Sequence, residues 1–199
     1  MDEPTTILGR PEPPTGRRVT VPGPSDLDDD QRALYERITQ GPRRSEQGLV
    51  PIADPEGRLL GPFGLMLLAP SIGESVQELG AALRFRGALT PRSRELVILV
   101  VAAHAGSHFE WWAHEKAALA AGLDPSQLQR LLDGETPEGL DATERCCVAV
   151  AFALRREQGL SDEAYADAKA TLGEAGLAEV TWLVGYYAML ALALEVLRP

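Results

Sequence analysis

The sequence predicts an all-α protein of seven or eight helices. Helix start and stop signals divide most of the chain beyond residue 25 into segments of helical length. Several of these segments carry apolar residues at helical spacing, and no stretch of useful length alternates apolar and polar residues as a strand does. Because 45% of the 199 residues are apolar, one sizeable core is expected. We therefore predict a single helical domain over residues 25–199.

The N-terminal segment 1–24 is predicted to be an extended arm. Five prolines fall between Pro11 and Pro24, and proline-rich segments remain extended unless they lie along a folded body. The first residues, MDEPTTILGRPEPP, contain no apolar stretch of the kind that forms the centre of a signal peptide.

The first predicted helix begins at Ser25 or Asp26 and ends at Gly41. Its residues Leu34, Tyr35 and Ile38 share one face. The segment 41–61 that follows has three prolines and no periodicity, and loops of this length in compact domains are often functional.

Proline marks the next two helices. Pro62 is expected to begin a short apolar helix, and Pro70 to end it. Ser71 and Glu74 have the spacing of a capping box, in which two side chains satisfy backbone N–H groups at a helix start. They are predicted to open the following helix.

The most informative stretch is LTPRSRELVILVVAAHAGSHFEWWAHEKAALAAGL, residues 89–123. Thr90 suits the position that caps a helix N-terminus, and Pro91 suits the first helical position, which needs no N–H. Gly106 suits the left-handed residue that ends this helix. Ser107 is expected to cap a second helix that ends at Gly122. The stretch therefore predicts a buried helical hairpin.

The remaining helices also have clear starts. They are expected from Asp124-Pro125 to Leu132, from Asp141 with Glu144 through the apolar run Cys146 to Leu154, from Ser161 to Leu172, and from about Leu177 to Leu197. The last of these is apolar on every face, so it should be buried on all sides. Part of its surface is expected to be covered by another subunit.

Charge and cysteine content limit the possible functions. A net charge of −10 argues against a nucleic-acid partner, because a phosphate binder needs a basic face. Cys146 and Cys147 are adjacent on a helix and poorly placed to form a disulfide with each other, which fits a reducing cytoplasm. The apolar run from Val180 to Leu194 is shorter than a membrane span. We expect a protein that neither spans a membrane nor binds nucleic acid.

Three ionisable residues of the hairpin are candidates for proton transfer. Glu110 and His114 lie four residues apart, hence on one helix face. Counted from the Gly106 turn at ~1.5 Å per residue, His114 lies at a depth between Glu110 and Glu95. A histidine flanked by carboxylates is a natural proton relay.

Each of these residues also has a purely structural interpretation. Glu110 might only complete a capping box with Ser107, and Glu95 might only favour the dipole of its own helix. His114 might be a satisfied core histidine. The buried convergence of all three favours the functional interpretation.

Other residues were considered for binding. His104, His108, Glu110 and His114 are metal-ligand types, but their spacing does not match a helical metal motif, so no metal site is predicted. One of Trp111 and Trp112 should lie in the core, and the other may line a pocket. An arginine among Arg84, Arg86, Arg92 and Arg94 may clamp a substrate carboxylate. We assign substrate binding to Trp111, Arg94 and His108.

The stretch 89–123 resembles the core motif of the carboxymuconolactone decarboxylase family, in the alkylhydroperoxidase D-like superfamily. A looser resemblance extends over about residues 31–197. The resemblance implies an AhpD-like all-α fold and assembly as a trimer or hexamer. It also implies an enzyme that uses no cofactor. Peroxidase members carry a Cys-x-x-Cys pair, a histidine four residues after it, and a glutamate on the preceding helix. Glu95 and His114 match that pattern, whereas Ser107 and Glu110 stand where the cysteines would be.

The resemblance and the residues together predict a cofactor-independent carboxy-lyase or isomerase. Glu95, Glu110 and His114 would be its catalytic residues, and its substrate a small carboxylated lactone or another enolisable compound. The alternatives are a peroxiredoxin-like antioxidant protein and a non-catalytic oligomeric protein that binds a small molecule.

Overall fold

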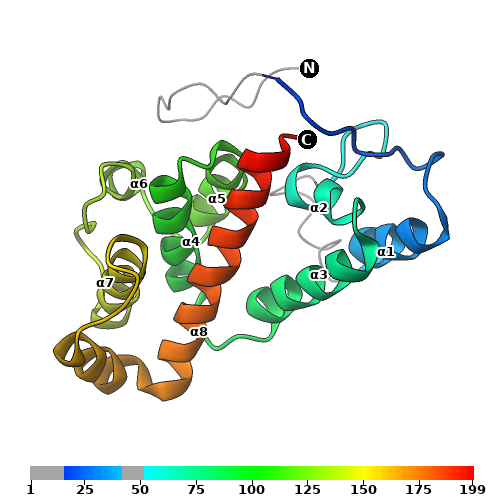
Figure 1. Ribbon diagram of the computed structural model, residues 1–199. Coiled ribbons are helices and arrows are strands. Elements are labelled where there is room, and N and C mark those ends of the chain that lie inside the picture. The colour runs from blue at the N-terminus through cyan, green and yellow to red at the C-terminus, as the bar shows by residue number, and fades with distance from the viewer. Residues whose placement is uncertain (1–15, 42–51) are drawn as a thin grey trace. The chain divides into compact units, whose positions relative to one another are not determined.

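The computed structural model describes residues 16–41 and 52–199, and within them the protein is all-α, as predicted (Figure 1). The only β interaction in these ranges is an isolated bridge between Ala53 and Leu59. The eight helices are α1 Asp29–Gln40, α2 Gly61–Met66, α3 Pro70–Phe85, α4 Pro91–Ala105, α5 His108–Ala120, α6 Pro125–Leu132, α7 Ala142–Arg156 and α8 Asp162–Leu197.

The predicted N-terminal arm lies largely outside the described residues, as do residues 42–51 of the predicted 41–61 loop. Residues 16–24 have no helix or strand. The described chain falls into two compact units, one of residues 88–191 and one of residues 16–41, 52–87 and 192–199. The single domain over residues 25–199 therefore stays a prediction.

The unit that holds α1, α2 and α3 begins at Asp28. The Asp28 carboxylate accepts from the Gln31 backbone N–H, and the Gln31 side chain accepts from the Asp28 N–H. Ser25 and Asp26 therefore do not open the helix, because the reciprocal capping box forms two to three residues later. Leu34 and Ile38 are buried on the predicted face.

Pro70 was expected to end a helix, but it begins α3 instead. It occupies the first helical turn after the N-cap residue Ala69, where its missing N–H costs nothing. The Ser71 and Glu74 capping box does not form at this helix start. Proline permits both a helix end before it and a helix start at it, and the neighbouring packing decides between them.

The other unit is built around α4, which packs against α5, α6 and α7. Every residue from Leu96 to Ala102 has no exposed surface. The predicted N-cap Thr90 accepts a hydrogen bond from the Ser93 N–H, and Gly106 ends α4 with φ of 62°. A helix that is apolar all round needs neighbours on all sides, and α4 has them within this unit.

Helix α8 is interrupted at Gly173, whose φ of 71° and ψ of 170° are not helical. Two helices were predicted here, and the break lies between them. By length and composition alone α8 could cross a membrane, but one such helix is weak evidence, since core helices pass the same test. Its buried residues include Leu183, Tyr186, Tyr187 and Leu190.

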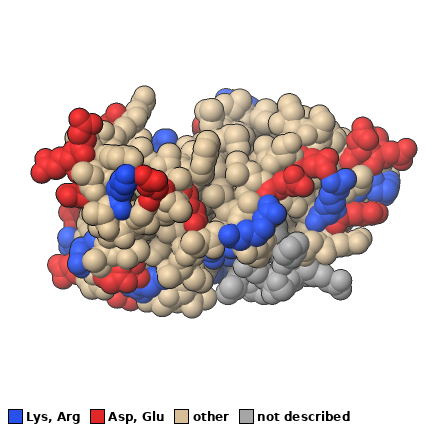
Figure 2. All heavy atoms as spheres, turned by 90° about the horizontal axis from the view of Figure 1, so that it is seen from below, with Lys and Arg blue, Asp and Glu red and all other residues tan. Residues whose placement is uncertain are grey.

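Charged side chains are spread over the surface. Figure 2 shows acidic residues distributed across the visible face, with basic ones interspersed among them rather than gathered into a broad basic surface. This face therefore lacks the charge pattern that binding to a phosphate backbone requires.

Candidate active site

A buried contact between a glutamate and a histidine joins the two helices of the hairpin. The Glu95 Oε2 atom lies 2.7 Å from the His114 Nδ1 atom. The Glu95 side chain is almost fully buried, and the His114 side chain keeps 13% of its surface exposed. The predicted meeting of Glu95 with His114 is therefore present in the structure, with one carboxylate oxygen on one ring nitrogen.

The local sequence explains how this pair forms. Gly106 takes the left-handed conformation that lets α4 end and α5 begin within two residues. The two helices then pack against each other. Counted from Gly106 at ~1.5 Å per residue, His114 lies ~12 Å and Glu95 ~16 Å from the turn, and the two side chains span the difference.

Glu110 lies on the same face of α5 as His114, one turn nearer the Gly106 turn. Its side chain is buried, with 2% of the residue exposed. Burial raises the pKa of Glu110 to about 8, and the Ser107 hydroxyl offsets only part of that rise. Glu110 is therefore a neutral carboxylic acid at pH 7.

The alternative structural role for Glu110 is wrong. The Ser107 side chain makes no capping hydrogen bond at the start of α5. Neither carboxyl oxygen of Glu110 makes a hydrogen bond of good geometry among the described residues, although the Ser107 hydroxyl is near enough to lower its pKa. A capping box would have engaged one of them with the Ser107 backbone N–H.

Tyr187 of α8 is a site residue that the sequence analysis did not single out. Its ring meets the His114 ring edge to face, with 5.0 Å between the ring centroids. Tyr186 packs against Tyr187 in the same way at 5.3 Å. Such contacts fix the orientation of a ring. No local pattern points to Tyr187, because the contact depends on how α8 packs in the fold.

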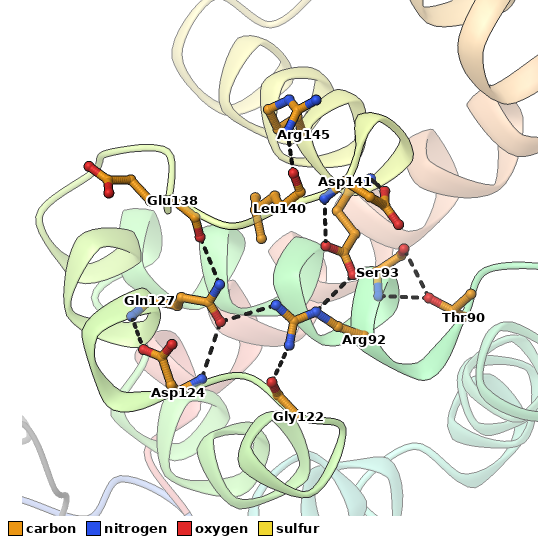
Figure 3. A network of polar contacts seen from close by, with 11 residues as sticks. Thr90, Arg92, Ser93, Gly122, Asp124, Gln127, Glu138, Leu140, Asp141 and Arg145 are labelled. Carbon is orange, nitrogen blue, oxygen red and sulfur yellow. Dashed lines mark hydrogen bonds and ion pairs between the residues drawn. The ribbon is translucent and has the colours of Figure 1, made fainter.

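Arg92 has a structural role at the start of α4 (Figure 3). Its Nε atom lies 2.8 Å from Glu144 Oε1, and its Nη2 atom donates to Gln127 Oε1 at 3.1 Å. It also donates to the Gly122 carbonyl. Glu144 and Gln127 each complete a capping box, on α7 and α6. Arg92 therefore binds three helix ends together, three residues before Glu95.

The three predicted substrate-binding residues have different surroundings. Arg94 is mostly buried, with its Nε atom 3.9 Å from Glu95 Oε1. His108 is the half-buried first residue of α5. Trp111 has no exposed surface and is the core tryptophan, while Trp112 is partly exposed and stacks at an angle on Phe109. Their roles in binding stay predictions.

The set of possible metal ligands is not brought together. His104 is exposed at the end of α4, where burial and the nearby Arg155 and Arg156 lower its pKa. Within the ranges described, no three histidine, cysteine or acidic side chains form a group suited to a metal ion.

The two cysteines lie away from the hairpin, on α7. Cys147 is buried, and burial raises the pKa of its thiol to about 12. Burial also raises the pKa of Cys146. Both are thiols rather than thiolates at neutral pH, so neither has the character of a reactive cysteine.

Comparison with known proteins agrees with this geometry. Residues 70–153, which include α4, α5 and the Glu95–His114 pair, match the model of the carboxymuconolactone decarboxylase family. Over these residues the chain is similar to that family. The resemblance predicted from residues 89–123 is thereby confirmed.

Several solved structures share the fold at low sequence identity. An uncharacterized peroxidase-related protein with an AhpD core from Ralstonia eutropha JMP134 has a TM-score of 0.71 and 13% identity, over 92% of both chains. The debrominase Bmp8, as a cysteine-to-alanine variant with 2,3,4-tribromopyrrole, has a TM-score of 0.68 and 15% identity, over 92% of both chains.

A peroxidase-related protein from Silicibacter sp. TM1040 has a TM-score of 0.69 and 14% identity, over 97% of this chain and 94% of that one. No curated protein matches the sequence.

Proposed function

We propose that this protein is a cofactor-independent cytoplasmic enzyme that moves protons at a small carboxylated lactone or another enolisable substrate. The observation that carries the proposal is the buried pair of Glu95 and His114, with 2.7 Å between carboxylate oxygen and ring nitrogen. The similarity to the carboxymuconolactone decarboxylase family supports a catalytic protein of the decarboxylase type.

The pair assigns different tasks to the two imidazole nitrogens. In the neutral imidazole whose Nδ1–H donates to the Glu95 carboxylate, the other nitrogen, Nε2, is the one that can act as a base. Nε2 can then take a proton from a carbon next to a carbonyl group and return it to another carbon, which moves a double bond. In decarboxylation, Nε2 first takes the proton of the substrate's carboxylic acid. The carbon–carbon bond then breaks, CO₂ leaves, and the imidazolium returns that proton to the carbanionic carbon.

Substitution of His114 tests this proposal. In D₂O, we expect wild-type protein to introduce deuterium at the carbon next to the carbonyl of α-angelica lactone, which NMR measures. The alternative assay is release of CO₂ from carboxylated γ-lactones. His114→Ala and His114→Gln should lower the rate by ~10²-fold or more, because a positioned acid–base group contributes about that much.

His104→Ala is the matched control, since that histidine is exposed at the far end of α4. It should retain the wild-type rate. Wild-type rates in both folded His114 variants would show that the proton relay is wrong, and circular dichroism would establish folding. The glutamine variant keeps a polar group beside Glu95 in case the alanine variant does not fold.

A peroxide-reducing function is the second candidate, because two of the similar structures are described as peroxidase-related. That chemistry would have to use Cys146 and Cys147, and the raised pKa of both thiols disfavours it.

Replacement of both thiols distinguishes the two candidates. The double variant Cys146→Ser with Cys147→Ser should show the same lactone turnover as wild-type protein, because neither thiol lies on the hairpin. Reduction of tert-butyl hydroperoxide by wild-type protein, lost in the double variant, would instead establish the peroxidase function.

A further inference from the structure

Glu110 carries a buried polar group whose hydrogen-bonding capacity is unused. Its residue is 2% exposed, and neither carboxyl oxygen makes a hydrogen bond of good geometry among the described residues. A buried polar group without a hydrogen-bond partner destabilises the folded state. Native proteins keep few such groups, and each calls for an explanation.

The local contacts do not supply that explanation. Glu110 does not complete a capping box with Ser107, and no ion pair of the described chain includes it. His114 directs its Nδ1 atom to Glu95 rather than to Glu110. Structure alone therefore gives this carboxyl group no role.

Its position relative to His114 suggests one. Residues four apart on a helix have Cβ atoms about 5–6 Å apart on one face. A small molecule that places a carbon at His114 Nε2 would therefore have its neighbouring atoms within reach of Glu110. The titratable groups around His114 are Glu95 on α4, with Arg94 beside it, and Tyr187 on α8.

The protonation state of Glu110 determines whether it can donate a hydrogen bond to such a molecule. With a pKa of about 8, the group is a neutral carboxylic acid at pH 7. A neutral carboxylic acid donates one O–H hydrogen bond, whereas a carboxylate only accepts. A buried neutral acid is a strong donor to an oxygen that becomes negative during a reaction.

We propose that Glu110 donates the hydrogen bond that holds the developing oxyanion of the substrate beside His114, so that the substrate is a carbonyl compound bound through that oxygen. This inference rests on the proposed proton-transfer function and assigns its substrate class. In the step, the carbon–hydrogen bond breaks and its proton goes to His114 Nε2. The electron pair forms the new carbon–carbon double bond, and the carbonyl π pair moves to the oxygen held by Glu110.

The enolate then collapses as the carbonyl reforms and His114 returns the proton to carbon. Glu110 keeps its proton through the cycle, so no further reactant is needed. Decarboxylation gives the same enolate, because loss of CO₂ leaves its electron pair on the carbon next to the carbonyl.

Two substitutions at Glu110 test the donor role. Glu110→Leu removes the donor at similar volume and should lower the rate of deuterium exchange into α-angelica lactone by ~10²–10³-fold, mostly in kcat. Glu110→Gln keeps an N–H donor, so its exchange rate should fall by a smaller factor. The wild-type rate should fall as the pH rises above about 8, where Glu110 ionises. Glu110→Gln should lack that fall.

A binding measurement makes the test independent of turnover. 4-Nitrophenol is the probe, because its phenolate resembles an enolate oxygen. Binding should lower the pKa of 4-nitrophenol. The bound probe should then show the visible absorption of its anion at a pH where free 4-nitrophenol is neutral. This shift should persist in His114→Gln and Glu110→Gln and disappear in Glu110→Leu. The infrared band of a protonated carboxylic acid should be present in wild-type protein and absent from Glu110→Gln.

The outcomes separate the two proposals. Binding with the phenolate shift but no exchange in wild-type protein would reject the proton-transfer function and keep the donor role. Exchange that depends on His114 while Glu110→Leu retains the wild-type rate and shift would reject the donor role alone. An unshifted 4-nitrophenol spectrum with wild-type protein would also overturn it.

Discussion

Glu95 and Glu110 are both buried on one helical hairpin, yet their surroundings differ. Glu95 lies 2.7 Å from His114 Nδ1 and 3.9 Å from Arg94 Nε, so positive or donating groups stabilise its charge. Glu110 has no such neighbour, and burial favours its neutral form. Two carboxyl groups with opposite environments can perform opposite tasks, one as an acceptor and one as a donor.

The burial of Glu110 predicts a pH dependence of stability. Its pKa rises from 4.5 in the unfolded chain to about 8 in the folded protein, so the folded state binds more protons between these values. The contribution of this proton binding to the free energy of unfolding is fully present below pH 4.5 and is lost as the pH rises toward 8. Between pH 4.5 and 8, Glu110→Gln should gain on the order of 5 kcal/mol relative to wild type.

Urea unfolding at several pH values measures this difference. Glu78→Gln, at an exposed position of α3, is the control and should follow the wild-type pH dependence. A Glu110→Gln curve parallel to that of wild-type protein would show that Glu110 is already ionised at neutral pH.

At this scale the sequence predicted the site only in part. Counting the helical rise placed His114 between Glu95 and Glu110, but it could not say which carboxylate it contacts. That choice depends on side-chain direction and on the packing of α4 against α5. Tyr187 was missed because it reaches His114 from a helix more than 70 residues away in the sequence.

The helix ends are held by side chains that also connect different helices. Arg92 contacts Glu144, Gln127 and the Gly122 carbonyl, and so joins α4 to the starts of α6 and α7. Glu179 of α8 accepts hydrogen bonds from the backbone N–H groups of Ala88 and Leu89, directly before α4. The start of α4, and with it Glu95, is therefore fixed by several elements at once.

Removal of Arg92 should consequently cost more than removal of an exposed arginine. Arg92→Met leaves the mostly buried Glu144 carboxylate without its cation, and we expect a loss of about 2–4 kcal/mol of unfolding free energy. Arg130→Met is the control, since its ion pair with Glu135 is solvent-exposed and worth roughly 1 kcal/mol or less. Equal losses in the two variants, measured by urea unfolding, would contradict a structural role for the Arg92 network.

The sequence predicted most helix ends where cap residues act locally. Thr90, Asp124 and Asp141 cap the helices that were expected from them. Errors occurred at Ser25 and at Pro70, where two adjacent residues or two opposite roles satisfy the same local rule. Packing then decides, and a single sequence does not reveal it.

At the scale of the whole molecule, α8 has apolar surface that the described chain leaves uncovered. It was predicted to be buried on all sides, but Trp182 is 66% exposed and Leu192 is 64% exposed. Met189 and Val196 are exposed as well. The spacing of 182, 185, 189, 192 and 196 alternates between three and four residues, which is the pattern of a helix seam that packs against another helix.

We propose that a second copy of the chain covers this seam, in a homo-oligomer such as a trimer or hexamer. A repeated apolar stripe can serve both partners of a symmetric interface, and Gly185 at its centre would let two helices approach closely. Figure 1 shows α8 as a long continuous ribbon in its C-terminal half, so the stripe runs along one helix.

Replacing Trp182 tests this assembly. Trp182→Glu puts a charge into the seam, where its desolvation opposes association, and should convert the oligomer into a species near the 21.4 kDa chain mass. Tyr165→Glu, at an exposed position before the Gly173 break in the same helix, is the control and should leave the oligomer intact. Sedimentation velocity at micromolar concentration measures both. A wild-type protein that sediments as a single species of about one chain mass would reject the interface, and the exposed tryptophan would then require another partner.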